Sequence, residues 1–171
     1  KKIEGANRFQ ILWRIAQGEE DAKQEFTLYR LLSILIQASN ALAYAHARGV
    51  IHRDVKPENV LVGLFGEVYM MDWGVAKVWG MPNEGGEADF TKEDVMNRLT
   101  ASGKRPGTPL YMSPEQVQDR PIDERTDIFS MGVVLYETLA LREPFRGARI
   151  KDTFGNILND EPPPPSTVSQ H

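Results

Sequence analysis

The chain has 171 residues, of which 41% are hydrophobic and 26% charged, and this is enough for one soluble globular domain with a real core. Its formal net charge is −4 and its Lys and Arg residues are not clustered, so we expect no nucleic-acid partner. It has no cysteine, which excludes disulfides and thiolate zinc sites and is compatible with a reducing compartment; we expect a cytoplasmic protein.

In chain order, the first predicted element is a helix from Thr27 to Ala47. Apolar residues recur there at helical spacing, Thr27 can cap the start, and Gly49 can end the helix. Two short strands follow, at 60–62 and 68–71, and residues 63–66 supply the turn between them, so we expect a β-hairpin. Polar residues interrupt both long apolar stretches, 31–45 and 131–141, so no membrane segment is expected.

The next segment, 75–105, is predicted to be a long and mostly irregular loop. At most one helical turn is expected in it, after Thr91. Loops of this length inside a domain are usually functional or disordered. Residues 127–141 then predict a helix that is apolar on most faces and therefore central. Four prolines at 162–165 indicate a rigid surface connector. The expected fold class is α+β, mostly helical, with a small β-hairpin.

Polar residues flank the predicted hairpin at one end. Asn59 comes just before its first strand and Asp72 just after its second. In an antiparallel pair the start of one strand lies beside the end of the other, roughly 5 Å away, so the two residues should be neighbours. An amide oxygen and a carboxylate form an oxygen-donor site that suits Mg²⁺, with phosphates completing the coordination.

Two further residues lie on the loop that leads to the same end. The Asp54 carboxylate could accept the proton of an attacking hydroxyl. Lys56 adds a cation where the charge on a transferring phosphoryl group needs neutralising. Each residue alone has an ordinary interpretation as a turn former or an exposed loop residue. The joint spacing makes the pattern specific.

Four motifs in this order resemble those of protein kinases. Residues 52–59, with His52-Arg53-Asp54 followed by Asn59, are similar to the catalytic-loop signature. Asp72-Trp73-Gly74 resembles the Asp-Phe-Gly magnesium motif, residues 107–115 resemble the end of the activation segment, and residues 127–132 resemble the start of the central helix. The resemblance covers nearly the whole chain and is to the C-terminal lobe of serine/threonine protein kinases of the bacterial, eukaryotic-like type.

The resemblance implies ATP and Mg²⁺ as cofactors and a protein with a Ser or Thr acceptor as substrate. It implies that Asp54 is the catalytic base and that Asn59 and Asp72 hold the metal ions. Lys56 would contact the γ-phosphate, and Thr108 would bridge Asp54 and Lys56 near the substrate. The residues expected to bind the cofactor are Lys56, Asn59, Leu61 and Asp72.

Regulatory and structural roles also follow from the resemblance. Arg53 beside the base suggests control by activation-loop phosphorylation, with Thr100 and Ser102 as the candidate acceptors. Asp127 could simply favour a helix N-terminus, but the resemblance implies that it ties the catalytic loop to the central helix. The other residues expected to be structural are His52, Trp73, Gly74 and Glu115.

The resemblance divides the chain, 1–171, into parts of an incomplete kinase domain. These are a hinge remnant (1–5), the catalytic loop (52–59), the activation segment (72–115) and the central helix (127–141), with the C-terminal part of the lobe missing. No glycine-rich phosphate loop or strand lysine is present, so the N-terminal lobe is expected to be absent. The arginine that normally pairs with Glu115 is expected beyond His171.

Two consequences are expected. The isolated chain should have little activity, because phosphoryl transfer depends on positioning. Apolar surface that would pack against the absent N-terminal lobe and the absent C-terminal part of the lobe should be exposed, and it should favour association of the chain.

Two alternatives remain. Small-molecule phosphotransferases share a related Asp, Asn and Asp core and often have Asp-Trp at the metal position, as here at 72–73, but they lack a segment like 107–115. A pseudokinase or scaffold would use the lobe only to bind partners. The joint presence of Asp54, Asn59 and Asp72 argues against it.

Overall fold

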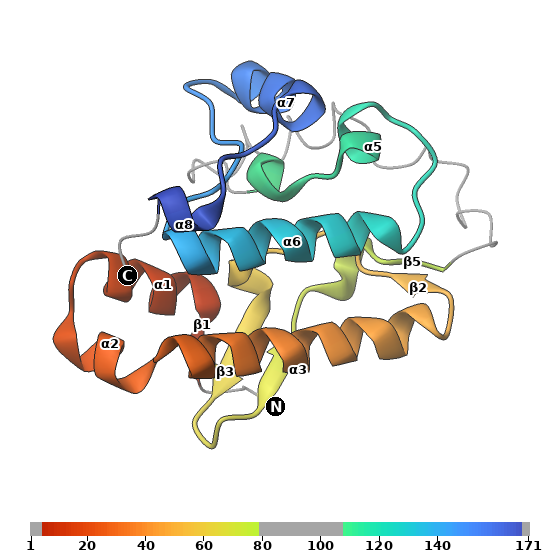
Figure 1. Ribbon diagram of the computed structural model, residues 1–171. Coiled ribbons are helices and arrows are strands. Elements are labelled where there is room, and N and C mark those ends of the chain that lie inside the picture. The colour runs from red at the N-terminus through yellow and green to blue at the C-terminus, as the bar shows by residue number, and fades with distance from the viewer. Residues whose placement is uncertain (1–4, 79–107, 169–171) are drawn as a thin grey trace.

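Two long helices that run antiparallel to one another form the centre of the computed structural model, which describes residues 5–78 and 108–168 (Figure 1). Helix α3 spans Leu28–His46, and the side-chain oxygen of Thr27 accepts a hydrogen bond from the Arg30 backbone N–H at 3.3 Å. Gly49 has a φ of 72° in the turn that follows. The predicted helix, its cap and its glycine exit are thus confirmed.

Helix α6 spans Arg125–Ala140 and covers the region predicted as the central helix. It begins two residues before Asp127 and ends one residue before Leu141, which adopts a left-handed conformation with φ 53°. Its side chains are buried on several faces, including Thr126, Val134 and Thr138, each 0% exposed. The helix is therefore central, although one side of it reaches the surface at Ile128, which is 61% exposed.

The predicted hairpin is present as β3 (Val60–Gly63) and β4 (Val68–Met70), with Val60 opposite Met70. A third strand, β1 (Gly5–Asn7), pairs antiparallel with β3, so the strand order is β1-β3-β4. A second pair joins β2 (Val50–Ile51) to β5 (Lys77–Val78). The sequence patterns did not predict β1, β2 or β5.

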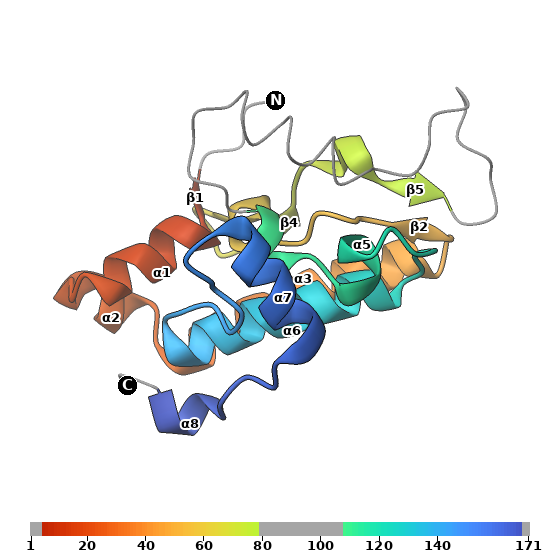
Figure 2. The same ribbon diagram turned by 90° about the horizontal axis from the view of Figure 1, so that it is seen from above.

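The remaining elements are short apart from α1 and α7. They are α1 (Arg8–Ala16), α2 (Glu20–Glu25), α5 (Pro114–Val117), α7 (Ile150–Asn159), α8 (Pro165–Val168) and the 3-10 turns η1 (Pro57–Asn59), η2 (Trp73–Val75) and η3 (Thr108–Tyr111). The small sheets lie on one side of the α3–α6 pair and α8 lies on the opposite side (Figure 2). The helical turn expected after Thr91 lies outside the described residues.

Helix α3 contributes to two hydrophobic clusters and so joins the halves of the core. Leu31 belongs to a cluster with α1, α2 and the three-stranded sheet. Leu35, one turn later, belongs to a cluster with η3, α5, α6 and α7. The result is a helix-rich α+β fold with small sheets, as the sequence predicts for the fold class.

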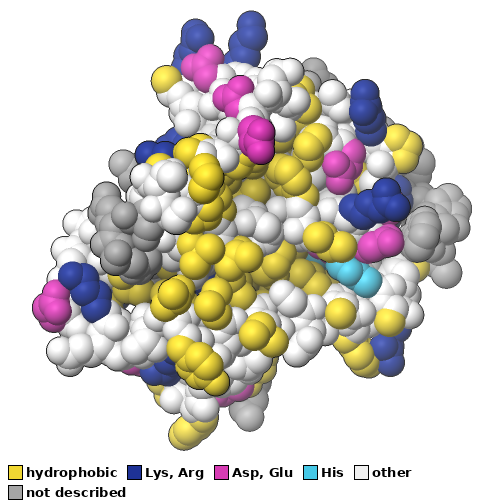
Figure 3. Space-filling model, in the orientation of Figure 1, with side chains coloured by type: hydrophobic (Ala, Val, Ile, Leu, Met, Phe, Trp, Pro, Cys, Tyr) yellow, Lys and Arg dark blue, Asp and Glu magenta, His cyan; other side chains and the backbone are white. Residues whose placement is uncertain are grey.

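Hydrophobic side chains gather in a band across the face seen in Figure 3, over the region where α3, α6 and α7 lie in Figure 1. These helices carry exposed apolar residues, among them Ile36 at 62%, Ile128 at 61% and Leu158 at 37%. Contiguous apolar surface of this kind favours contact with another protein segment. Within the described part of the chain, no helix has the length and apolar character needed to cross a membrane.

Two glycines provide a test of the sheet and helix geometry. A Cβ on Gly5 would lie 2.2 Å from the Val62 carbonyl oxygen, whereas a Cβ on Gly132 in α6 meets nothing within 4 Å. We expect Gly5→Ala to lower the free energy of unfolding by about 1–3 kcal/mol, because β1 must shift. Gly132→Ala should raise it by up to about 1 kcal/mol, because alanine is the better helix former. Urea unfolding measures both, and a neutral Gly5→Ala would contradict the β1–β3 register.

Candidate active site

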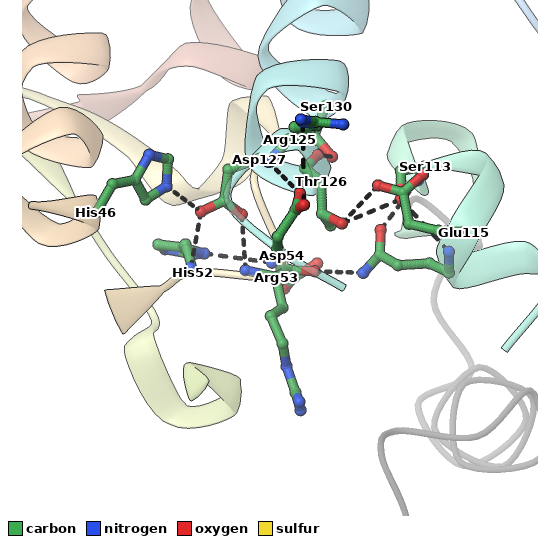
Figure 4. Close-up of polar contacts among 12 residues, drawn as sticks. His46, His52, Arg53, Asp54, Ser113, Glu115, Arg125, Thr126, Asp127 and Ser130 are labelled. Atoms are coloured by element: carbon green, nitrogen blue, oxygen red, sulfur yellow. Dashed lines mark hydrogen bonds and ion pairs between the residues drawn. The ribbon is translucent and has the colours of Figure 1, made fainter. Parts of the chain in front are cut away.

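The site begins with the carboxylate of Asp127, which is completely buried in the first turn of α6. Its Oδ2 accepts a hydrogen bond from the His52 backbone N–H at 2.8 Å, and its Oδ1 accepts one from the Arg53 N–H at 2.8 Å. The His46 ring nitrogen Nε2 lies 2.7 Å from the same Oδ2 (Figure 4). One side chain of the central helix therefore holds the start of the loop that carries Asp54.

Arg53 needs such support because its φ is 68°, in the left-handed region that non-glycine residues seldom adopt. Conformations of this kind cost of order 1–3 kcal/mol and persist only where neighbours enforce them. Asp127 holds the Arg53 N–H, and the Gln116 side-chain nitrogen Nε2 donates to the Arg53 carbonyl oxygen at 2.9 Å. The strained backbone immediately before Asp54 is thus held on both sides.

Asp54, Lys56 and Asn59 meet in one partly buried group. The Lys56 Nζ lies 2.6 Å from the Asp54 Oδ2, and both side chains are 16% exposed. The Asn59 Nδ2 donates to the Asp54 carbonyl oxygen at 2.8 Å and to its Oδ2 at 3.1 Å. The carboxylate of Asp54 is therefore oriented by the Lys56 cation and the Asn59 amide nitrogen.

The hairpin brings Asp72 to the same end. The Met71 N–H donates to the Asn59 carbonyl oxygen at 2.8 Å, so Asn59 lies opposite the residue that precedes Asp72. Asp72 is exposed and has a left-handed conformation, φ 59°. Leu61 is half-buried on β3 opposite Tyr69, and strand alternation turns it to the face away from its buried neighbours Val60 and Val62.

His52 and Trp73 support the junction between loop and hairpin. His52 is completely buried; its Nε2 donates to the Met71 carbonyl oxygen at 2.9 Å, and its Nδ1 accepts from the Asp54 N–H at 3.3 Å. The Trp73 ring lies against the His52 ring, with centroids 4.5 Å apart. The Trp73 indole N–H donates to the Met70 carbonyl oxygen at 2.9 Å, a bond that phenylalanine could not make. Gly74 follows in η2 and is exposed.

The end of the predicted activation segment lies beside this loop. Glu115 is half-buried in α5, and its Oε1 accepts a hydrogen bond from the Thr126 hydroxyl at 2.6 Å. Ser113 caps α5 through a capping box with Gln116. Thr108 begins η3, but its side chain, and all of Thr100 and Ser102, lie outside the described residues.

A buried ionisable cluster lies next to the site and joins four elements. The Tyr111 hydroxyl donates to the Glu137 Oε2 at 2.8 Å, and burial together with Glu143 raises the pKa of Glu137 to about 7. Burial lowers the pKa of Arg8 to about 10 against the pull of Glu137. Arg8 donates to the Leu31 carbonyl oxygen at 3.2 Å and to the Thr138 hydroxyl. Burial also raises the pKa of Glu58.

Sequence reasoning assigned no role to His46, Gln116 or the cluster around Glu137. His46 and Asp127 are 81 residues apart, so no local pattern could join them. The available signals were weaker: Gln116 stands three residues after Ser113, the spacing of a capping box. Glu137 stands on an otherwise apolar stretch of a central helix, where a charged residue calls for partners.

The donor set suits a cation that draws part of its coordination from a bound phosphate. Among the described residues, no group of three or more His, Cys, Asp or Glu side chains could hold a metal ion. Asn59 and Asp72 offer one amide oxygen and one carboxylate, which is the partial oxygen coordination that Mg²⁺ accepts when phosphates supply the rest.

Comparison with known proteins finds a matching family model and related sequences. A family model described as "Protein kinase domain" matches residues 7–170. The chain is 37% identical over 147 residues to the serine/threonine-protein kinase PknD of Protochlamydia amoebophila, covering 85% of this chain and 15% of that protein. It is 38% identical over 136 residues to the PknD protein of Chlamydia pneumoniae, covering 79% of this chain and 15% of that protein. The chain thus spans less than a fifth of the length of these relatives.

The Asp127 anchor can be tested by Asp127→Asn. One amide oxygen cannot replace two carboxylate oxygens that receive hydrogen bonds from His46, His52 and Arg53. We expect the free energy of unfolding to fall by roughly 2–4 kcal/mol, since buried donors lose a charged acceptor. Asp123→Asn is the matched control, because Asp123 is 41% exposed and accepts from the Arg125 N–H, a bond that asparagine keeps. Equal melting curves for the two variants would contradict the anchor.

The raised pKa of Glu137 predicts a pH dependence of stability. Its value shifts from 4.5 to about 7 on folding, so folding retains a proton that the unfolded chain releases above pH 4.5. The stability this provides is complete below pH 4.5 and is lost as the pH rises to about 7, a change on the order of 3 kcal/mol.

The difference in free energy of unfolding between Glu137→Gln and the unsubstituted chain isolates this effect. We expect the glutamine variant to gain stability relative to the unsubstituted chain between pH 5 and pH 8, measured by urea unfolding at several pH values. For the control Glu161→Gln, at an exposed position, the plot of the free energy of unfolding against pH should run parallel to that of the unsubstituted chain. Parallel curves for Glu137→Gln as well would show that Glu137 titrates normally.

Proposed function

Because the chain belongs to the protein kinase family, we propose that it is the C-terminal, catalytic lobe of a serine/threonine protein kinase. The observation that carries the proposal is the contact group of Asp54, Lys56 and Asn59 at the end of the hairpin that bears Asp72. A base, a cation and two oxygen ligands for a metal ion are the groups that phosphoryl transfer requires.

In the proposed reaction, the hydroxyl of a protein serine or threonine attacks the γ-phosphorus of ATP. Asp54 accepts the hydroxyl proton, a new oxygen–phosphorus bond forms, and the bond to the β-phosphate oxygen breaks, with ADP leaving with the electron pair. The contacts of Asp54 with Lys56 and Asn59 orient its carboxylate for this role. The Lys56 ammonium group, which lies beside the Asp54 carboxylate, would neutralise charge that develops on the γ-phosphoryl group.

Asn59 and Asp72 are the proposed ligands of Mg²⁺, which when bound would neutralise the phosphate charges. Leu61 joins them as a proposed cofactor-binding residue, since its side chain lies on the face of β3 away from the core. The ring of Trp73, which directly follows Asp72, packs against the His52 ring. ATP would therefore meet polar ligands at the hairpin end and an apolar surface beside them.

The proposed control of the enzyme involves Arg53 and the activation segment. A phosphate on Thr100 or Ser102 would carry negative charge that the Arg53 guanidinium can pair with, and the strained Arg53 backbone adjoins the proposed base. Thr108 is proposed to contact Asp54 and Lys56 when substrate binds.

We also propose that the chain is one lobe of a longer enzyme, so that the isolated 171 residues have little activity. Phosphoryl transfer relies on positioning, and the chain spans 15% of the relatives that it matches. The exposed apolar residues on α3, α6 and α7 would favour association of the isolated chain.

Asp54→Asn tests the function in the native polypeptide that contains this chain. Transfer of radiolabelled phosphate from ATP to serine- and threonine-containing peptides should fall by about 10²–10⁴-fold, because asparagine cannot accept the proton. Asp160→Asn, at an exposed position, should keep full activity, and the isolated chain should transfer little phosphate. If the native polypeptide shows no Mg²⁺-dependent transfer, or Asp54→Asn keeps it, the proposed function is wrong.

A further inference from the structure

The peptide group between Arg53 and Asp54 is held by a residue from a distant part of the chain. The Gln116 side-chain Nε2 donates to the Arg53 carbonyl oxygen at 2.9 Å, across 63 residues of sequence. This carbonyl belongs to the peptide bond that leads directly into the proposed base. Its orientation therefore sets the direction in which the Asp54 side chain leaves the backbone.

Gln116 is itself fixed in orientation by a second contact. Its Oε1 accepts a hydrogen bond from the Ser113 backbone N–H at 2.9 Å, and its own backbone N–H donates to the Ser113 hydroxyl at 3.4 Å. Both ends of the side-chain amide are thus engaged. Turning the amide over would place its nitrogen against the Ser113 N–H and its oxygen against the Arg53 carbonyl, and both contacts would become repulsive.

Of the two ends of the Gln116 side-chain amide, capping of α5 uses only the oxygen, so it does not explain why the nitrogen donates to Arg53. Its partner, Arg53, has a strained φ of 68°, and the other side of the same residue is held by Asp127. The two constraints come from different elements: Asp127 from the central helix α6, and Gln116 from α5, which begins within the last residues of the proposed activation segment. Of these two contacts, the Gln116–Arg53 hydrogen bond is the one that depends on the position of the end of that segment.

We propose that Gln116 is a positioning residue for the proposed kinase reaction, which holds the catalytic loop through the Arg53 carbonyl and so links the end of the activation segment to Asp54. The inference rests on the proposed function. When α5 is in place, the loop keeps the conformation in which Asp54 contacts Lys56 and Asn59. When the Gln116–Arg53 hydrogen bond is lost, the Arg53 backbone can relax from its strained conformation, and the Asp54 carboxylate then loses its orientation.

Two matched variants separate this role from capping. Gln116→Glu keeps an oxygen for the Ser113 N–H but places a second oxygen against the Arg53 carbonyl. Ser113→Ala removes the hydroxyl from the same capping box and leaves the Gln116–Arg53 bond in place. Steady-state kinetics of the native polypeptide that contains this chain, with ATP and an acceptor peptide, are measured for each.

We expect Gln116→Glu to lower kcat by about 10- to 100-fold, the effect of a misplaced catalytic group, with KM for the peptide within about twofold of the unsubstituted protein. Ser113→Ala should keep kcat within about threefold. Hydrogen exchange in a peptide covering residues 51–59 should be faster in Gln116→Glu and unchanged in Ser113→Ala. If Gln116→Glu does not fold, Gln116→Met replaces it; methionine puts no charge against the carbonyl, and because it also loses the acceptor for the Ser113 N–H, hydrogen exchange at 51–59 is then the deciding readout.

The proposal is overturned if Gln116→Glu keeps full kcat, if the two variants behave alike, or if only KM for the peptide rises. The last outcome would mean that Gln116 shapes the peptide-binding surface alone. If the unsubstituted protein transfers no phosphate, the proposed function fails, but hydrogen exchange at 51–59 still decides whether Gln116 holds the loop. Unchanged exchange in Gln116→Glu would then reject the positioning role by itself.

Discussion

The structure depends on a buried carboxylate that is held mainly by hydrogen-bond donors of the loop it organises. Asp127 is completely inaccessible to water and accepts from two successive backbone N–H groups, those of His52 and Arg53, with the His46 ring beside them. Burying a charge is unfavourable unless such bonds replace its hydration. The charge on α6 and the bent backbone of the loop are therefore stable only together, which explains why the strained residue before Asp54 is tolerated.

Sequence reasoning succeeded where the signal is local and periodic. The helix of Leu28–His46 has a capping residue, regular apolar spacing and a glycine exit, and the β3–β4 hairpin has two short apolar runs around a turn that contains Gly63 and Gly66. The hairpin also placed Asn59 and Asp72 at one end by the geometry of antiparallel pairing. Strands β1, β2 and β5 were missed because two or three residues are too few to show alternation, and their pairing is decided by tertiary packing.

Contacts across long sequence separations could not be predicted in the same way. The bond of Gln116 to Arg53 spans 63 residues, and the contact of His46 with Asp127 spans 81. Arg8 reaches the Thr138 hydroxyl across 130 residues, close to Glu137. A single sequence shows only that polar side chains stand on apolar elements and need partners; which partners they find is settled by how α1, α5 and α6 pack around the loop.

We propose that the loop held by Asp127 presents Asp54, Asn59 and Asp72 to a nucleotide and its metal ion. The most direct test is a crystal structure of the native polypeptide with Mg²⁺ and a non-hydrolysable ATP analogue. We expect metal coordination by the Asn59 side-chain oxygen and the Asp72 carboxylate, with the Asp54 carboxylate facing the γ-phosphate and the Asp127 hydrogen bonds intact. A nucleotide bound elsewhere, or metal coordination without Asn59 and Asp72, would contradict it.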